Sequence, residues 1–548
     1  MRAGPLTAEL DGADLRSVRW GNLEIASRIQ VTVRDERWGT LRPTVRHAGV
    51  VQRPDGFAVT LDTDHGDGAF AWRGTLEGRS DGTLTFAIDG IAERDFVYRR
   101  IGICVEHPWA PYVGARYKAS GAGHGTEGTF QQDIAPQLLV GGMLQPLIPS
   151  FVQLAVAFPG GVHTTFAFGG EPEGYELEDQ RNWTDASFKS YPTPLRSSQP
   201  RTLRRGERLR QRLEVRVEGP ATSSVDDHGP VRVELGSPSS RVMPDVGVSM
   251  PRGSADVAAL LDLQPAHLRV VLPTPDETSE SLRGAVTLAR AAAVPLELVC
   301  LLDEHPAPSL GLDASLKRVM LLRRDGATTD GELVAEARAR LGRDGVPICG
   351  GTSSHFSELN RRNPNPSGMD AIALALTPQM HAIDERSMVS SLEIQAQIVT
   401  RVREMTGDLP VVVSRVTLAS HEGIGDDHGT PDERVGSAFG AAWTVGSVAN
   451  LAAAGAASVT VHEAVDRTIL TSEALSRAVR ELTSRRGLPL DLVASSDPRR
   501  VVAIAAAGTP ILLANLTPDT QEAALDGTMV ERRSLGPYEL ASLERSPR

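Results

Sequence analysis

Eight short apolar runs alternate with helix-like segments between residues 245 and 466, and this alternation constrains the fold more than any other feature. The runs carry apolar residues at successive positions, which is typical of parallel strands that are covered on both faces. Eight strand–helix units in about 225 residues favour a closed (β/α)8 barrel over an open doubly wound sheet. The runs are residues 246–250, 267–273, 295–303, 317–325, 346–351, 369–378, 410–418 and 457–464.

The segments on either side of this region have a different pattern. Residues 1–225 consist of short runs of alternating apolar and polar residues separated by turns, which predicts an N-terminal antiparallel β-sandwich. Residues 486–548 return to short alternating strands, which predicts a small C-terminal β-sandwich. We therefore expect a multidomain β and α/β protein, with the barrel at residues 240–485 carrying the active site.

Composition excludes several classes of partner. The net charge is −12, and such an acidic surface repels nucleic acid and anionic lipid. Two long uncharged runs, residues 137–170 and 436–462, are interrupted by Pro and Gly or consist largely of Ala, Gly, Ser and Thr, so neither predicts a membrane span. The N-terminus lacks the apolar core of a signal peptide. We expect a cytoplasmic protein that binds neither nucleic acid nor membrane, and its oligomeric state stays open.

The three cysteines, Cys104, Cys300 and Cys349, are far apart and form no CxxC pair, which indicates neither a disulfide framework nor a thiolate zinc site. No GxGxxG or GxxxxGK[ST] sequence follows any strand, so the main nucleotide-binding motifs are absent. We expect no cofactor and no metal.

Reactive groups of a barrel enzyme lie at the carboxyl ends of its strands and in the loops that follow. The fifth strand leads into residues 350–366, which we interpret as a long polar loop. The sixth strand ends in TPQMHAID, the seventh has a basic residue inside an apolar run, and the eighth ends in two polar residues. The candidates from these places are His355, Glu358, Asn360, Arg361, His381, Asp384, Arg415, His462 and Glu463.

Glu358 and Glu463 would face each other across the mouth, three strands apart. Two opposed carboxylates suit hydrolysis at a sugar ring, and they also suit a hydrolase in which one group activates water. Spacing alone does not choose between these reactions. His381, Asp384, His462 and Glu463 are also metal-ligand types, but no HxH or HExxH pattern accompanies them.

Residues 174–195 (GYELEDQRNWTDASFKSYPTPL) combine acids, amides and aromatic residues in one segment. Aromatic rings stack on the C–H faces of sugars, and carboxylates and amides bind hydroxyls, so the segment predicts a sugar-facing wall with Glu178 and Trp183 as binding residues. The same composition is typical of a conformational anchor between domains, with Trp183 as a plug.

Four segments together resemble the bacterial D-apionate lactonase family: RRIGICVEHP (99–108), EDQRNWTDASFKSY (178–191), HFSELNR (355–361) and TPQMHAID (377–384). The resemblance covers essentially the whole chain. It implies an N-terminal β-sandwich, a central barrel and a C-terminal β-domain. It also implies hydrolysis of D-apionolactone, a branched sugar γ-lactone, to D-apionate in apiose catabolism.

From the barrel argument we expect Glu358 or His381 to take a proton from water. We expect Arg361, Arg415 or His462 to stabilise the oxyanion. Glu463 or Asp384 would orient the histidine or protonate the ring oxygen. The residues that we expect to bind substrate are His355, Asn360, Arg361, Asp384, Arg415, His462, Glu178 and Trp183. Two alternatives are a furanosidase that uses paired glutamates, and a sugar-binding protein without turnover. The barrel resembles retaining glycosidases only distantly, because its acids follow strands five and eight and the usual Asn-Glu pair is absent.

Overall fold

In this computed structural model the chain forms two units, which we describe separately. The first contains Met1–Arg181 and Ala186–Asp227, and the second contains Asn182–Asp185 and His228–Arg548. The structure describes residues 1–121, 124–171, 173–195, 200–221, 229–250, 257–272, 280–302, 315–341, 345–420, 432–462, 468–526 and 531–545.

The first unit is built from two antiparallel sheets of nine strands each that share one apolar core. Alternating burial along β8 (Thr83–Ile91) shows why: every second side chain enters the core and the others face away. One sheet has the order β1 (Arg2–Ala3), β2 (Leu6–Asp11), β3 (Asp14–Trp20), β4 (Leu23–Asp35), β9 (Phe96–Pro108), β18 (Ser187–Tyr191), β17 (Tyr175–Asp179) and β14 (Ile148–Phe151), with β19 (Arg201–Leu203) on β9. The other has the order β11 (His124–Thr129), β10 (Arg116–Gly121), β15 (Gln153–Ala157), β16 (His163–Gly169), β20 (Arg208–Glu218), β8, β7 (Phe70–Arg79), β6 (Gly56–His65) and β5 (Pro43–Arg53).

Short elements complete the first half of the chain. They are α1 (Trp109–Tyr112), the pair β12 (Leu139–Val140) and β13 (Met143–Leu144), and the 3-10 turn η1 (Gln180–Trp183). The turn η1 lies between β17 and β18, where the chain passes from the first unit into residues Asn182–Asp185 of the second.

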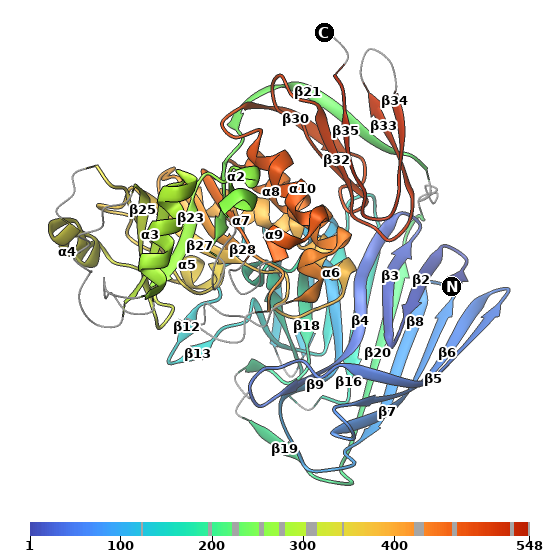
Figure 1. Cartoon of the computed structure of the whole chain (residues 1–548). Helices are drawn as coiled ribbons and strands as arrows, with labels where there is room; N and C mark the ends of the chain where they lie inside the picture. The colour runs from blue at the N-terminus through green and yellow to red at the C-terminus, as the bar shows by residue number, and fades with distance from the viewer. Residues whose placement is uncertain are drawn as a thin grey trace. The chain divides into compact units, whose positions relative to one another are not determined.

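The second unit contains a closed barrel of eight parallel strands, which confirms the predicted fold class (Figure 1). Each of the eight apolar runs overlaps with one strand, and the strands follow one another around the barrel in chain order. Their interior is filled by side chains such as Val299, Met320 and Ala373. The strands are β22 (Asp245–Ser249), β23 (Leu268–Leu272), β24 (Leu296–Leu302), β25 (Leu316–Arg323), β26 (Ile348–Gly351), β27 (Ala371–Leu376), β28 (Val411–Val416) and β29 (Ser458–Val461).

Helices follow the strands. The Ala-rich α8 (Ala438–Ala454) shows the local rules: the Ser437 side chain accepts from the Gly440 N–H at its start, and Gly455 ends it with a φ of 87°. One expectation was wrong: residues 350–366 are not a long loop, because Phe356–Arg362 form helix α5. The other helices are α2 (Val257–Leu263), α3 (Glu280–Ala292), α4 (Gly331–Leu341), α6 (Glu385–Ser390), α7 (Leu392–Met405), the 3-10 turn η3 (Glu433–Gly436), α9 (Thr468–Thr471) and α10 (Glu473–Thr483).

Two small sheets with a common core follow the barrel in the second unit. We expected this part to begin at residue 486, but β21 (Val231–Val242), which precedes the barrel, forms part of it. It pairs antiparallel with β30 (Pro489–Ser495) and parallel with β33 (Gln521–Asp526). The remaining strands are β34 (Glu531–Leu535) in the same sheet and β31 (Val501–Ile504), β32 (Ile511–Asn515) and β35 (Leu540–Leu543) in the other.

Two further observations concern expectations from composition. The three cysteines are buried and unbonded, and burial raises the pKa of each thiol to about 12. Thiols of this kind are not nucleophiles at neutral pH. Among the helices that the structure describes, none is long and apolar enough to cross a membrane.

Candidate active site

A histidine–aspartate pair lies beyond the sixth barrel strand. His381 follows β27, and its Nδ1 is 2.7 Å from Oδ2 of Asp185, which belongs to the Asn182–Asp185 segment of the same unit. The two side chains are mostly buried, with 19 % and 11 % exposed. A carboxylate at this distance fixes the proton on Nδ1 and leaves Nε2 as the basic nitrogen of the ring.

The segment that carries Asp185 is fixed on both sides of Trp183. Asn182 Oδ1 accepts a hydrogen bond from Asn360 Nδ2 of α5 at 2.9 Å, and Thr184 Oγ1 donates to the Thr377 carbonyl at 3.0 Å. Thr184 has a φ of 70°, which is strained for a β-branched residue. Such strain is concentrated at functional sites, where the surrounding contacts hold it.

Trp183 lies close to two histidine rings. Its ring centroid is 5.6 Å from that of His355 and 6.3 Å from that of His381. The pKa of His355 is lowered to about 4, mainly by burial and also by its electrostatic interactions with Arg415 and His381. His355 is therefore neutral near pH 7, and Arg415 and His381 both lie within electrostatic range of it.

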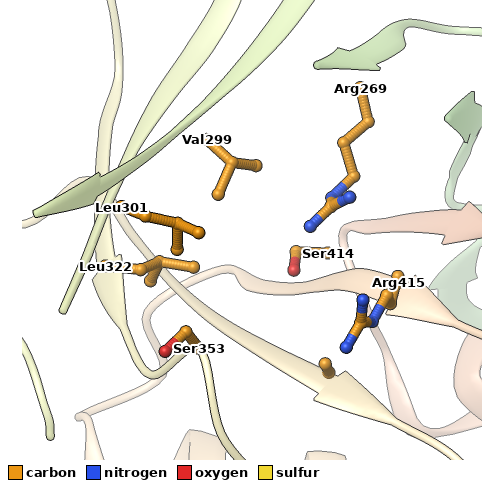
Figure 2. Close-up of a pocket in the computed structure, with 8 residues that line it drawn as sticks. Arg269, Val299, Leu301, Leu322, Ser353, Ser414 and Arg415 are labelled. Carbon is orange, nitrogen blue, oxygen red and sulfur yellow. The ribbon is translucent and has the colours of Figure 1, made fainter. Parts of the chain in front are cut away.

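A cavity lies in the barrel interior (Figure 2), and one residue that lines it, Arg415, acts electrostatically on His355. Two arginines line it, Arg269 from β23 and Arg415 from β28. The register of β28 against β29 shifts between Val413 and Val416, and both Ser414 and Arg415 reach the cavity from this stretch. The other lining residues are Val299, Leu301, Leu322, Ser353 and Ala375.

Two predicted site residues are engaged with each other on α5. The Glu358 carboxylate binds Arg361, and it also binds Arg362 at 3.1 Å. These ion pairs lie along one face of a short helix and give Glu358 and Arg361 a structural role. A catalytic role for Glu358 stays a prediction, and the two arginines on its carboxylate argue against it.

Asp384 caps α6, where its carboxylate accepts hydrogen bonds from the Ser387 N–H and the Ser387 hydroxyl, both at 2.9 Å. These contacts give it a structural role, and a role beside His381 stays a prediction. The carboxylate in contact with His381 Nδ1 is that of Asp185.

The Asp384→Ala protein should lose about 1 kcal/mol of unfolding free energy, since an N-cap of this kind is worth that much. Its kcat per folded molecule should be unchanged. Chemical denaturation and initial rates on the same preparation measure both quantities. A fall in kcat of more than tenfold would restore Asp384 to the site.

His462 follows β29 directly and is fully buried. Its Nε2 lies 2.8 Å from the Thr444 hydroxyl, its carbonyl accepts from the Ser249 hydroxyl at 2.8 Å, and its φ is 58°. Burial lowers its pKa to about 4, so it is a neutral packing partner near pH 7. Glu463 lies outside the described residues.

Glu178 is buried in the first unit. Its carboxylate accepts from Arg100, from Gln180 at 2.8 Å and from Gln137 at 3.3 Å. These contacts give it a structural role within that unit, and its role in substrate binding stays a prediction.

The neutral buried histidines make the second unit sensitive to acid. The folded-state pKa of His355 and of His462 is about 4, against 6.5 for an ordinary histidine, so the unfolded chain binds more protons between these values. Stability should therefore be full above pH 6.5 and fall as pH drops to 4, by up to about 3 kcal/mol per histidine. Denaturant titrations at pH 7, 6, 5 and 4 measure this, and a flat profile would contradict it. The His355→Gln protein should show a shallower fall.

Sequence reasoning missed two residues of this group. Asp185 is one of several acids in residues 174–195, and Arg269 is a charge inside the apolar run 267–273; neither was among the candidates. The position of Arg269 inside a buried strand was the signal that could have identified it as a site residue. Across the described ranges, no group of three or more His, Cys, Asp and Glu side chains is arranged to hold a metal ion.

Known proteins match the chain along both of its units. A model of the D-apionate lactonase N-terminal domain matches residues 1–220, and a model of the D-apionate lactonase TIM barrel domain matches residues 249–483. The chain belongs to the D-apionate lactonase family. A D-apionate lactonase of Brucella anthropi is 26 % identical over 455 residues, which is 76 % of this chain and 72 % of that protein. As a member of this family the chain is an enzyme, and it is a lactonase.

Solved structures add only distant similarity. The GH36 alpha-galactosidase AgaA from Geobacillus stearothermophilus aligns over 100 % of this lactonase and 98 % of its own chain, with 8 % identity and a TM-score of 0.28. A GalM/aldose epimerase homologue from C. elegans covers 32 % of this chain and 69 % of its own, with 7 % identity and a TM-score of 0.22. Similarity at this level supports no argument about function.

Proposed function

We propose that this enzyme opens the ring of D-apionolactone and releases D-apionate. Membership of the D-apionate lactonase family supports the substrate, since the Brucella anthropi relative carries that name. The observation that carries the mechanism is the 2.7 Å contact between His381 and Asp185 beyond a barrel strand, because it provides a general base that is already oriented.

In the proposed reaction His381 Nε2 takes a proton from a water molecule, and the water oxygen forms a bond to the lactone carbonyl carbon. The carbonyl oxygen becomes an oxyanion. As the intermediate collapses, the bond between the carbonyl carbon and the ring oxygen breaks. The protonated His381 returns its proton to that oxygen, which leaves as a hydroxyl. The new carboxylic acid loses a proton to solvent and becomes a carboxylate.

Asp185 has two tasks in this scheme. It holds the imidazole in the tautomer that presents a basic Nε2, and it stabilises the imidazolium that forms when the proton is taken. Arg415 is the proposed donor to the oxyanion, since its charge acts on His355 together with that of His381. A donor of this type contributes about 3 kcal/mol to the transition state. Trp183 and neutral His355 would contact the sugar hydroxyls and C–H faces.

The furanosidase alternative requires two available carboxylates at the mouth. Glu358 is bound to Arg361 and Arg362, and no contact among the described residues favours it as acid or nucleophile. We therefore put forward the lactonase alone.

A pH-drop assay tests the substrate. D-apionolactone would be compared with unbranched γ- and δ-aldonolactones, with and without EDTA, and chromogenic furanosides would serve as a control. We expect the highest kcat/KM for the branched γ-lactone. An equal or higher kcat/KM for an unbranched lactone would overturn the proposed substrate, and turnover of furanosides alone would overturn the reaction.

A further inference from the structure

The cavity in the barrel interior has two chemically distinct sides. Arg269 and Arg415 lie on one side, and both are buried, with 5 % and 1 % exposed. Figure 2 shows their guanidinium groups directed toward the same space, with the Ser414 hydroxyl between them. Val299, Leu301 and Leu322 form the opposite side. Two cationic groups and a hydroxyl thus converge on a space with an aliphatic wall. The charge of Arg269 also acts on the buried carboxylate of Glu297, its neighbour on β24.

Buried charges of one sign that converge on a space are a common way to bind an anion. A guanidinium group donates parallel hydrogen bonds that match the two oxygens of a carboxylate. The aliphatic wall keeps water away, and this lowers the local dielectric and strengthens the charge–charge interaction. A neutral ligand would gain much less from the same groups.

The size of the space limits what can enter. The cavity volume is about 10 Å³, which is room for a group of about the size of one water molecule. A sugar ring does not fit there, whereas one oxygen of a ligand that lies mainly above the cavity does. One oxygen of a carboxylate or of a phosphate would fit equally well, and the planar carboxylate is favoured because the product of ring opening carries that group.

We propose that this cavity is a carboxylate subsite, in which Arg269 and Arg415 hold the acid group of the hydroxycarboxylate product. The inference rests on the proposed function, because ring opening converts a neutral lactone into an anion at the carbonyl carbon. The enzyme then binds its product more tightly than its substrate. Release of the acid, rather than ring opening, then limits turnover. D-apionate that accumulates inhibits the enzyme competitively.

Arg269 is the better residue for a test, since Arg415 also has a proposed role at the oxyanion. Binding of D-apionate to the full-length protein would be measured directly by calorimetry, without any lactone. The neutral polyol with the same carbon skeleton, inorganic phosphate and glycolate would be compared with it. The Arg269→Met and Arg269→Lys proteins would be tested beside Arg480→Met, which alters an exposed arginine that pairs with Asp262 at the surface of the same unit.

We expect D-apionate to bind at least tenfold more tightly than the polyol and than phosphate. Arg269→Met should weaken D-apionate binding about tenfold or more, since hydrogen bonds to charged groups are lost. Arg269→Lys should recover part of the loss, because it retains the charge without the planar fork. Arg480→Met should bind as the wild type does. Recovery by the lysine variant shows that the loss does not come from misfolding.

Equal affinity for D-apionate and the polyol would overturn the subsite, as would an unchanged affinity in a folded Arg269→Met protein. Tighter binding of phosphate would identify a phosphate site instead. If no lactone is turned over but D-apionate binds through Arg269, the proposed function fails and the subsite stands. If D-apionolactone is opened but D-apionate binds equally well without Arg269, the proposed function stands and the subsite fails.

Discussion

The Asp185→Asn protein should lose about 10²–10⁴-fold in kcat on the lactone, with a much smaller change in KM. An asparagine keeps the size and can still contact Nδ1, but it carries no charge to stabilise the imidazolium and can turn its N–H toward the ring, which favours the wrong tautomer. At the histidine, this substitution changes the contact at 2.7 Å. Steady-state kinetics at several pH values measure it.

The matched control is Asp370→Asn. Asp370 precedes β27, the strand whose other end leads to His381, and its carboxylate accepts from the Ile348 N–H and from Arg338. This substitution also removes one negative charge, but Asp370 lies at the end of β27 away from His381, so the kcat of this variant should stay close to that of the wild type. Similar losses in both variants would indicate general damage to the barrel, and a normal kcat in Asp185→Asn would remove Asp185 from the mechanism.

Arg100→Met should destabilise the first unit by about 3–5 kcal/mol, the largest effect on folding that we expect. The Arg100 guanidinium binds the carboxylates of Glu176 and Glu178, all three side chains are buried, and Arg100 also lies 4.2 Å from the centre of the Tyr191 ring. Burial raises the pKa of Glu176, while Arg100 opposes that shift. Without the arginine, two carboxylates would stay buried without their cation.

Denaturant unfolding followed by tryptophan fluorescence measures this loss. The triple variant Arg100→Met, Glu176→Gln, Glu178→Gln should recover most of the stability, because no unpaired charge is then left at these three positions. A loss below about 1 kcal/mol in Arg100→Met would mean that water reaches the two carboxylates and that the ion pairs are not a main support of the unit.

The barrel could be predicted from sequence because each strand is an apolar run that signals burial on both faces. Strand β21 could not, since residues 231–242 are broken by Gly and Pro and their partners are strands more than 240 residues later. Helix α5 was hidden for a similar reason. Its sequence FSELNRR is polar and is flanked by Ser, Asn and Pro, so local composition predicted a loop where ion pairs of Glu358 support a helix.

Sequence patterns did not predict which side chains pair in the candidate site. His381 and Asp185 are 196 positions apart, and no periodicity links them. Their segments, TPQMHAID and EDQRNWTDASFKSY, were both among those that carried the family resemblance, but a resemblance does not say which acid meets which histidine. Proximity in sequence pointed to Asp384, whose carboxylate instead satisfies the first turn of α6.

The most direct test of the account is a double-mutant cycle on kcat/KM for D-apionolactone, with Asp185→Asn, His381→Gln and both changes together. If Asp185 acts only through His381, the double variant should be no slower than His381→Gln alone. Losses that multiply, so that the double variant is slower by the product of the two single effects, would show that the two residues act independently and would contradict a histidine base oriented by Asp185.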